Sequence, residues 1–265
     1  MMGNYPTVDK AAACIIKNYE SYAVVQRTIN KKLIELLKIN APKHFNKVLE
    51  IGCGTGLFTA EFLADFSAEH LVLNDLYEEC QPYLVEKLQR NFTLMKSEFV
   101  FGDCLNTPLG DGYDLLVAAS VVEHLPCTQT FVQCAKAKLK RGGYLLFNSV
   151  NPQHFREIRA LVGEGVCYPS LLDWINQLET DFEIISIQQD GLCFLFESPE
   201  EVITHLDCTS ISPLKTAQWT EDFYREFIRQ YKLQFSQEGC VSLTYQPFII
   251  LFEVIYLTQH IGKKR

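Results

Sequence analysis

Three glycines at alternating positions most constrain how this chain can fold. They are Gly52, Gly54 and Gly56. An apolar, β-prone run that begins at Val48 precedes them, and a helix-prone segment begins at Leu57. A glycine loop between a strand and a helix lets the backbone approach a ligand closely at the edge of a parallel sheet. An ordinary turn would need one glycine rather than three, so the run predicts a ligand-binding loop.

The spacing of these glycines limits the kind of ligand. The pattern is G-x-G-x-G, whereas a dinucleotide fingerprint is G-x-G-x-x-G, and Leu57 stands where its third glycine would be. Glu50 lies just before the loop. A carboxylate there disfavours a pyrophosphate but can reach an ammonium group, directly or through water. The loop therefore favours a cofactor that carries an amino acid over a nicotinamide dinucleotide.

Two more acidic residues are expected where the next strands end. Asp75 lies about 20 residues beyond the last glycine, where a carboxylate can accept both hydroxyls of a ribose. Asp103 follows a third β-prone run, where it can accept from an adenine amino group. Each acid alone would be expected to cap the helix that follows it. Together with Glu50 and the glycines, they predict a cofactor that contains a nucleoside.

Runs of β-prone and helix-prone residues alternate from residue 47 to residue 149. This alternation is typical of a parallel sheet with helices on its faces. Five strands are predicted, over 47–51, 70–73, 98–101, 113–118 and 144–149. Helices are predicted from residue 57 onward, over 79–90 and over 131–139, and apolar residues at helical spacing predict a long helix over 11–37.

The last third of the chain has a different pattern. It predicts strands over 182–188 and 192–196, helices over 199–206 and 219–235, and one closing strand over 241–256. We therefore expect an α/β fold with a Rossmann-like sheet of seven strands. The expected organisation is a single domain over 1–265, with N-terminal helices over 1–45, a core sheet over 46–190 and 241–258, and a helical cap inserted over 191–240.

Composition narrows the class of protein. With 265 residues, of which 48% are hydrophobic, the chain can bury one full core. A net charge of −8 argues against a nucleic-acid partner, because phosphates require a basic face. No apolar stretch reaches the roughly 18 residues of a membrane-spanning helix. The histidines lack metal-ligand spacing, so we expect no metal. The cysteines are scattered and the sequence shows no export signal, so we expect a cytoplasmic location and no membrane partner.

The stretch from about residue 45 to residue 150 resembles the class I methyltransferases. Beside the glycine loop, Tyr113-Asp114 opens the fourth predicted strand and Gly142-Gly143 forms a turn before the fifth. The resemblance implies S-adenosylmethionine as the cofactor. The positions that match its binding site are Glu50, Gly52, Cys53, Gly54, Gly56, Asn74, Asp75, Leu76, Gly102, Asp103, Cys104 and Ala119.

The two flanks are similar to the biotin-pathway malonyl-[acyl-carrier protein] O-methyltransferases. Tyr19, Ala23 and Gln26 form a Y-x-x-x-A-x-x-Q pattern. The order of the following residues resembles the tail of that family: Phe196, Ser198, Pro199, Leu206, Trp219, Thr220, Phe227, Tyr231, Gly239 and the run 242–245. Two features depart from it, since Gln246 stands in place of the usual His and 207–210 replaces a glycine-rich turn.

This resemblance implies methyl transfer to the free carboxylate of a malonyl thioester on acyl carrier protein, or on coenzyme A, to prime pimeloyl synthesis for biotin. Tyr19 and Gln26 would then close over the methionine end of the cofactor as a helical lid. A carboxylate with a pKa of about 4 is already ionised at neutral pH, so no general base is required. We therefore assign no catalytic residue with certainty and expect alignment and water exclusion to carry the reaction.

A cation should orient the acceptor carboxylate. The candidate substrate residues are Arg156, Arg159, Lys215 and Arg225, together with Tyr19. Glu123 and His124 could instead form an acid–base pair for a different substrate, or simply begin the next loop. Two alternatives stay open at this point: methylation of another small molecule, such as a free carboxylic acid or a quinone precursor, and a non-catalytic partner subunit that binds S-adenosylmethionine.

Overall fold

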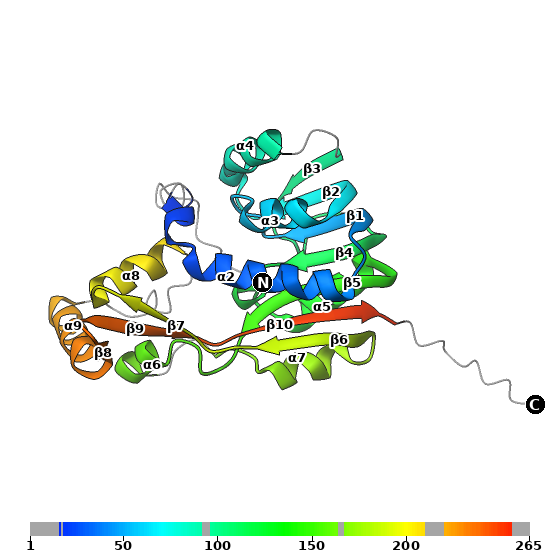
Figure 1. Cartoon of the computed structure of the whole chain (residues 1–265). Helices are drawn as coiled ribbons and strands as arrows, with labels where there is room; N and C mark the ends of the chain where they lie inside the picture. The colour runs from blue at the N-terminus through cyan, green and yellow to red at the C-terminus, as the bar shows by residue number, and fades with distance from the viewer. Residues whose placement is uncertain (1–15, 17, 92–95, 164–166, 210–219, 256–265) are drawn as a thin grey trace, which may run out of the picture.

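A mostly parallel sheet of seven strands forms the centre of the molecule (Figure 1). The computed structural model describes residues 16, 18–91, 96–163, 167–209 and 220–255. The strand order is β3-β2-β1-β4-β5-β10-β6, and β10 runs antiparallel to both of its neighbours. The bounds are β1 His44–Ile51, β2 Ser67–Asp75, β3 Lys96–Phe101, β4 Tyr113–Ala118, β5 Leu139–Val150, β6 Phe182–Gln189 and β10 Pro247–Val254. The five predicted parallel strands are confirmed.

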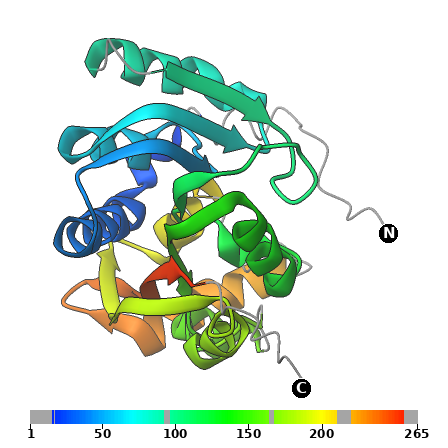
Figure 2. The same ribbon diagram turned by 90° about the vertical axis from the view of Figure 1, so that its right-hand side faces the viewer.

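Helices cover both faces of this sheet (Figure 2). On one face lie α2 (Val24–Asn40), α3 (Leu57–Asp65) and α4 (Gln81–Asn91), and on the other lie α5 (Thr128–Lys138) and α7 (Leu171–Leu178). Two short 3-10 helices, η1 (Glu78–Cys80) and η2 (Val122–His124), follow β2 and β4. Because both faces are covered, adjacent strand residues are both apolar: Val48 packs in the core under α2 and α3, and Leu49 in the core under α5 and α7.

The predicted N-terminal helix is broken near its start and runs on to Asn40, past the predicted end at residue 37. A turn at Ala23, with φ −78° and ψ 39°, separates the helical residues 18–22 from α2. The buried face of α2 carries Val25, Ile29 and Leu33, as the helical spacing predicts. Residues 1–15 and 17, which include the expected start of this helix, lie outside the described residues. The break changes the direction of the chain, so the segment that carries Tyr19 does not continue along the axis of α2.

The predicted turn at Gly142-Gly143 is wrong. Both glycines lie inside β5, where the pairing register with β4 shifts between Tyr113 and Leu115. Gly142 adopts φ 72° within this irregular stretch, a conformation that glycine tolerates. The helix predicted over 131–139 is confirmed as α5, which ends one residue earlier, at Lys138.

The single closing strand predicted over 241–256 is also wrong. The run forms two strands, β9 (Cys240–Tyr245) and β10, on either side of Gln246. β9 leaves the central sheet and pairs with β7 (Leu192–Phe196) and β8 (Ser236–Gln237). Both strands are apolar because both are buried, and composition alone does not show the change of sheet at Gln246.

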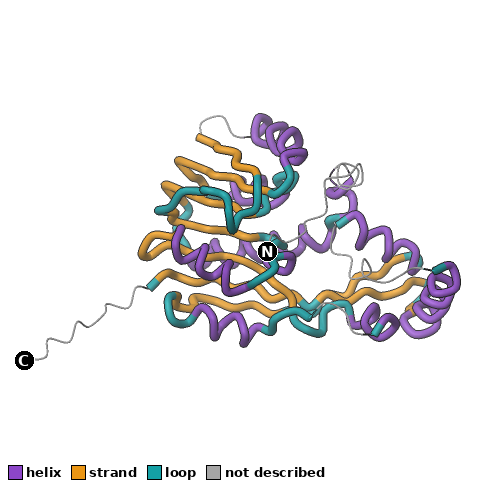
Figure 3. The backbone as a smooth tube through the Cα atoms, turned by 180° about the vertical axis from the view of Figure 1, so that it is seen from behind, coloured by secondary structure: helices purple, strands orange, loops and turns teal. Residues whose placement is uncertain are grey.

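A second layer at one end of the molecule consists of this three-stranded sheet and the helices α6 (Arg156–Val162), α8 (Pro199–Cys208) and α9 (Glu221–Phe235) (Figures 1 and 3). The inserted segment is therefore not only helical, and its sheet extends to Tyr245, past the expected boundary at residue 240. Its apolar residues continue the core under α2 and α3. The division into one domain with a cap stays a prediction.

A buried carboxylate joins α6 to β9 within this layer. Glu157 on α6 is fully buried and accepts hydrogen bonds from the backbone N of Thr244, at 2.9 Å, and from its Oγ1, at 2.6 Å. The segment after β5 is thereby tied to β9. Within the described residues, no helix is both long and apolar enough to cross a membrane.

Candidate active site

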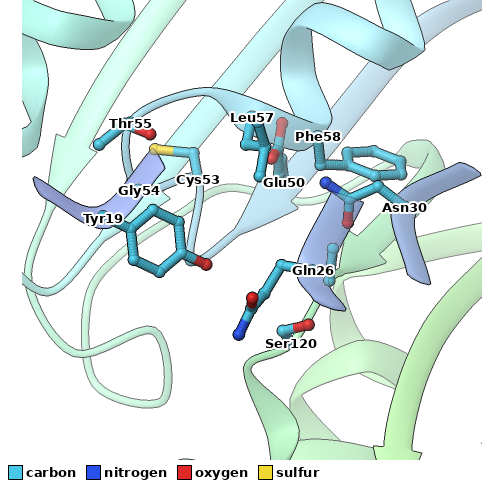
Figure 4. Close-up of a pocket in the computed structure, with 12 residues that line it drawn as sticks. Tyr19, Gln26, Asn30, Glu50, Cys53, Gly54, Thr55, Leu57, Phe58 and Ser120 are labelled. Atoms are coloured by element: carbon cyan, nitrogen blue, oxygen red, sulfur yellow. The ribbon is translucent and has the colours of Figure 1, made fainter. Parts of the chain in front are cut away.

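A cavity opens at the carboxyl ends of β1 and β4, next to α2 (Figure 4). It measures about 340 Å³, counting the part that is open to solvent. Its lining residues are Tyr19, Gln26, Asn30, Glu50, Gly52, Cys53, Gly54, Thr55, Leu57, Phe58, Ala119 and Ser120. Seven of these were predicted for the cofactor site: Tyr19, Gln26, Glu50, Gly52, Cys53, Gly54 and Ala119.

The glycine loop forms one wall of the cavity, and two of its glycines serve different purposes. Gly52 adopts φ +70°, and a Cβ there would lie 2.2 Å from Cγ2 of Val121. Gly54 adopts φ +50°, but no atom lies within 4 Å of its Cβ position. Gly52 therefore permits close packing of the loop on the segment after β4, whereas Gly54 presents bare backbone to open space, as approach of a ligand requires.

Asp75 links the glycine loop to the end of β2. Its Oδ2 accepts a hydrogen bond from Gly54 N at 2.8 Å, and its Oδ1 accepts one from Tyr77 N at 3.0 Å. Asn74 contributes its carbonyl to Cys53 N, and its side chain donates to the carbonyls of Val100 and Gly102. The side chain of Asn74 therefore holds β2 and β3 together. Burial raises the pKa of Asp75 above its ordinary value.

The end of β3 lies outside the cavity lining. Asp103 Oδ1 accepts a hydrogen bond from Leu105 N at 3.0 Å, so the side chain caps its own turn, as the alternative sequence interpretation allowed. Cys104 is buried, and its carbonyl accepts from Cys134 Sγ. Leu76 is partly exposed, and Gly56 is the N-cap residue of α3. A contact of these residues with the cofactor stays a prediction.

Glu50 gives the cavity an acidic floor. It is 2% exposed, and Thr59 Oγ1 on α3 donates to its Oε2 at 2.7 Å. Burial raises the pKa of Glu50 to about 8. None of the described lining residues is Lys, Arg or His. The cavity therefore favours a ligand that brings its own positive charge.

The helical segment around Tyr19 closes one side of the cavity. Figure 4 shows the ring of Tyr19 and the side chain of Gln26 on either side of the same open space. An ion pair between Glu20 and Lys87 Nζ joins this segment to α4. The same Nζ donates to the carbonyl of Thr55 in the glycine loop at 3.0 Å. Lys87 thus connects this segment to both α4 and the glycine loop, and the function of the segment as a lid stays a prediction.

Sequence reasoning missed five lining residues: Asn30, Thr55, Leu57, Phe58 and Ser120. Asn30 lies four residues after Gln26 on α2, so helical spacing could have found it. Leu57 and Phe58 begin α3. Ser120 is the second residue after β4. Its φ of 56°, unusual for a residue other than glycine, has no signal in the sequence.

The candidate cations are not equivalent. Arg156 Nε lies 3.3 Å from Glu157 Oε1, and Arg225 pairs with Glu221 at 2.9 Å on the exposed side of α9. Arg159 is partly buried and is in no such ion pair within the described part of the chain. Lys215 lies outside the described residues. None of the three described arginines lines the cavity.

Glu123 and His124 differ in burial, and an acid–base role for the two stays a prediction. Both lie on η2, where His124 is exposed while Oε2 of Glu123 is buried without a hydrogen-bond partner among the described residues. Burial raises the pKa of Glu123 to about 7. Among the described residues there is also no group of three or more His, Cys, Asp or Glu that could hold a metal ion.

The fold and the glycine loop together define a class of protein. A parallel sheet with one antiparallel strand, a strand-loop-helix unit with exposed backbone and an acidic floor are features of a class I methyltransferase, which uses S-adenosylmethionine. Residues 23–187 match a family described as methyltransferase domain. The crystal structure of the N-methyltransferase NodS from Bradyrhizobium japonicum, in complex with S-adenosyl-L-homocysteine, has the same fold, with a TM-score of 0.53 at 15% identity over 87% of each chain.

Sequence relatives identify the family more closely. The chain is 36% identical to the malonyl-[acyl-carrier protein] O-methyltransferase of Haemophilus ducreyi, over 89% of this chain and 92% of the relative. It is 30% identical to the protein of the same name from Porphyromonas gingivalis, over 88% and 89%. The chain belongs to the malonyl-[acyl-carrier protein] O-methyltransferase family.

The residues of the cavity fit S-adenosylmethionine. Three buried oxygens around it have no hydrogen-bond partner among the described residues: Gln26 Oε1, Thr55 Oγ1 and Ser120 Oγ. Buried polar atoms are normally paired, so unpaired ones beside a cavity indicate a polar ligand. Glu50 provides a carboxylate for a cationic amino-acid group, and the cofactor carries both an ammonium and a sulfonium charge.

Proposed function

We propose that this chain transfers the methyl group of S-adenosylmethionine to the free carboxylate of malonyl-acyl carrier protein. The observation that carries the proposal is the similarity to the Haemophilus ducreyi enzyme, which spans 89% of this chain and so includes the inserted segment as well as the sheet. The product would be a methyl ester that masks the charge of the malonyl group. A later elongation system could then use it to build a pimeloyl chain for biotin.

The residues of the cavity support this reaction without a general base. When bound, S-adenosylmethionine supplies a sulfonium methyl group that an ionised carboxylate can attack. Glu50 would hold the ammonium group, and Asp75 would accept from the ribose while it keeps its hydrogen bond to Gly54. Tyr19 and Gln26 would close over the methionine end and exclude water. The protein's contribution is then alignment and desolvation of two reactants that are already charged.

We assign the orientation of the acceptor carboxylate to Arg159. Its guanidinium has no carboxylate partner among the described residues, whereas those of Arg156 and Arg225 do. It also lies close enough to Tyr168 to lower the pKa of that hydroxyl, against the larger effect of burial, which raises it to about 12. A guanidinium can bind a carboxylate through two parallel hydrogen bonds.

The carrier of the malonyl group and the place of the reaction are further parts of the proposal. Acyl carrier protein is the expected carrier, and coenzyme A is the alternative. An acidic carrier would need a local basic patch on this acidic chain, and α6, with Arg156 and Arg159, is a candidate. The cytoplasmic location expected from the sequence stays a prediction.

The experiment is transfer of a labelled methyl group from S-adenosylmethionine. Malonyl-acyl carrier protein, malonyl-coenzyme A and a free dicarboxylic acid are compared as acceptors, with cofactor affinity measured separately by calorimetry. We expect label in a malonyl thioester, removed by mild ester hydrolysis. Tight cofactor binding without label in either thioester would contradict the proposed acceptor and favour another small molecule or a non-catalytic subunit.

A further inference from the structure

Unpaired polar atoms gather where β4 and β5 end, beside the cavity. Oε2 of Glu123, Oγ of Ser120 and Nδ2 of Asn148 are buried without a hydrogen-bond partner among the described residues. Ser120 lines the cavity, and its N–H donates to Asn148 Oδ1 at 2.8 Å. Its positive φ of 56° is a strained conformation that persists only where the surrounding structure holds it. These atoms indicate a second polar ligand group next to the glycine loop.

The carboxylate of Glu123 lies close to two tyrosine hydroxyls. Burial, and then the negative charge of Glu123, raise the pKa of Tyr19 well above its usual range. The same two causes, in the same order, raise the pKa of Tyr168 to about 12. Tyr168 packs edge-on against His154, with 5.7 Å between the ring centroids. Glu123 is therefore near both Tyr19 and Tyr168, which belongs to the segment that follows α6.

The surroundings keep Glu123 close to the midpoint of its titration at neutral pH. Burial raises its pKa to about 7, and it forms no ion pair within the described part of the chain. The ionisable groups that face it are Tyr19 and Tyr168, which are neutral at pH 7. His124, on the same element as Glu123, is exposed. The positive charge of Arg159 on α6 lowers the pKa of Tyr168. A large fraction of Glu123 therefore carries an O–H group that can donate.

We propose that Glu123 binds the acceptor carboxylate as a neutral hydrogen-bond donor, beside Ser120. The inference rests on the proposed function, because only a negatively charged acceptor requires Glu123 to be neutral. An ionised Glu123 would face the acceptor carboxylate, and two carboxylates in one buried site do not both ionise readily. The donated hydrogen bond goes to one acceptor oxygen, the other attacks the methyl group, and no proton changes place. Glu123 is thus a substrate-binding residue that makes acceptor binding depend on pH.

The test is the pH profile of kcat/KM for malonyl-acyl carrier protein from pH 6 to pH 9, at saturating S-adenosylmethionine. For the unmodified protein we expect a plateau at low pH and a fall of roughly tenfold per pH unit above about pH 7, as a single required proton is lost. Glu123→Gln keeps a donor that cannot ionise, so its profile should lack this fall. Glu123→Ala should raise KM below about pH 7, where the donated hydrogen bond is lost, and should also lack the fall because no carboxyl group is left to ionise. Glu183→Gln, an exposed position on β6, is the matched control and should follow the unmodified profile.

Two results would overturn the inference. One is a profile of the unmodified protein that stays flat up to pH 9, and the other is the same fall in Glu123→Gln as in the unmodified protein. Thermal melting checks that each variant folds, and if Glu123→Ala fails to fold, the comparison with Glu123→Gln still decides. Failure of the proposed function looks different: no label enters the malonyl thioester at any pH while the cofactor still binds.

Discussion

Thr59 donates a hydrogen bond to Glu50 over 2.7 Å, and both side chains are buried. This one neutral donor does not offset the loss of water around a carboxylate, and burial raises the pKa of Glu50 to about 8. A cationic group of a ligand would restore the ionised form. The arrangement therefore couples the charge of Glu50 to cofactor binding.

The cofactor-free protein should lose stability as the pH rises from about 5 to about 8. The unfolded carboxyl group has a pKa of 4.5 and the folded one a pKa of about 8, so the folded state binds more protons between these values. The free energy of unfolding, measured with urea at several pH values, should fall over this range. Glu50→Gln should reduce that fall and leave the part that comes from Glu123, whose pKa burial raises to about 7. Glu69→Gln, at an exposed position of β2, should leave the fall unchanged.

Affinity for the cofactor should rise with pH, whereas the stability of the cofactor-free protein falls, and both effects depend on Glu50. We expect Glu50→Gln to weaken binding of S-adenosylmethionine by roughly tenfold to a hundredfold, because a hydrogen bond to a charged group contributes about 1.5–3 kcal/mol. Binding to the unmodified protein should tighten as the pH rises toward 8 and should release a proton. Calorimetry in two buffers of different ionisation enthalpy measures both effects. Equal affinity of the two proteins for the cofactor would remove Glu50 from the site.

Gly54 and Gly112 form a matched pair for testing the glycine loop. They adopt φ +50° and +74°, and neither has an atom within 4 Å of its Cβ position. Substitution by Ala should cost both variants a similar free energy of unfolding, about 1–2 kcal/mol. Gly54→Ala alone should lose cofactor affinity, because its Cβ would occupy the space that the ligand approaches. A comparable loss in Gly112→Ala would show that the effect arises from stability.

Tyr19→Phe tests the lid. The hydroxyl faces the cavity, so its removal should lower the rate of methyl transfer while the melting temperature stays nearly unchanged. Tyr144→Phe, in the amino-terminal half of β5, serves as the control and should change neither quantity. If Tyr19→Phe instead lowers the melting temperature strongly and leaves turnover normal, Tyr19 is a packing residue.

Arg159→Ala and Arg156→Ala separate two arginines on the same helix. Arg156 is exposed and pairs with Glu157, so its removal should change KM for the malonyl thioester by less than about twofold. Removal of Arg159 should raise this KM by roughly tenfold or more, since a hydrogen-bonded charge pair would be lost. Steady-state kinetics at fixed cofactor give both values. The reverse order would assign the acceptor carboxylate to Arg156.

Much of the fold follows from local patterns. The strands β1 to β5 and the helices between them were predicted because short apolar, β-prone runs alternate with helix-prone runs and are bounded by turn residues. The run 241–256 was predicted incorrectly because β9 and β10 are both buried, and an apolar run has the same composition in either sheet. The turn at Gly142-Gly143 was predicted incorrectly for a related reason, since glycine also occurs in a bulge within a strand.

The residues of the candidate site also fall into two groups: those that the sequence predicted and those that only the fold brings together. Gly52, Gly54 and Glu50 could be found because they are close together in the sequence and lie where a parallel strand ends. Asn30 and Ser120 come from separate elements, and only packing brings them to the cavity. The sequence also could not show that Arg156 forms an ion pair while Arg159 forms none within the described residues, because ion pairing depends on the folded positions of the carboxylates.

The sequence by itself therefore determined the class of fold, the ligand-binding loop and its preference for a cationic cofactor, since these depend on residues that are close along the chain. Only the tertiary structure decided the path of the C-terminal run, the pairing of Arg156 and the burial of the Oε2 atom of Glu123. The physical reason is that burial and charge pairing are set by contacts between segments far apart in the sequence, and these contacts fix whether a carboxyl group is ionised at neutral pH.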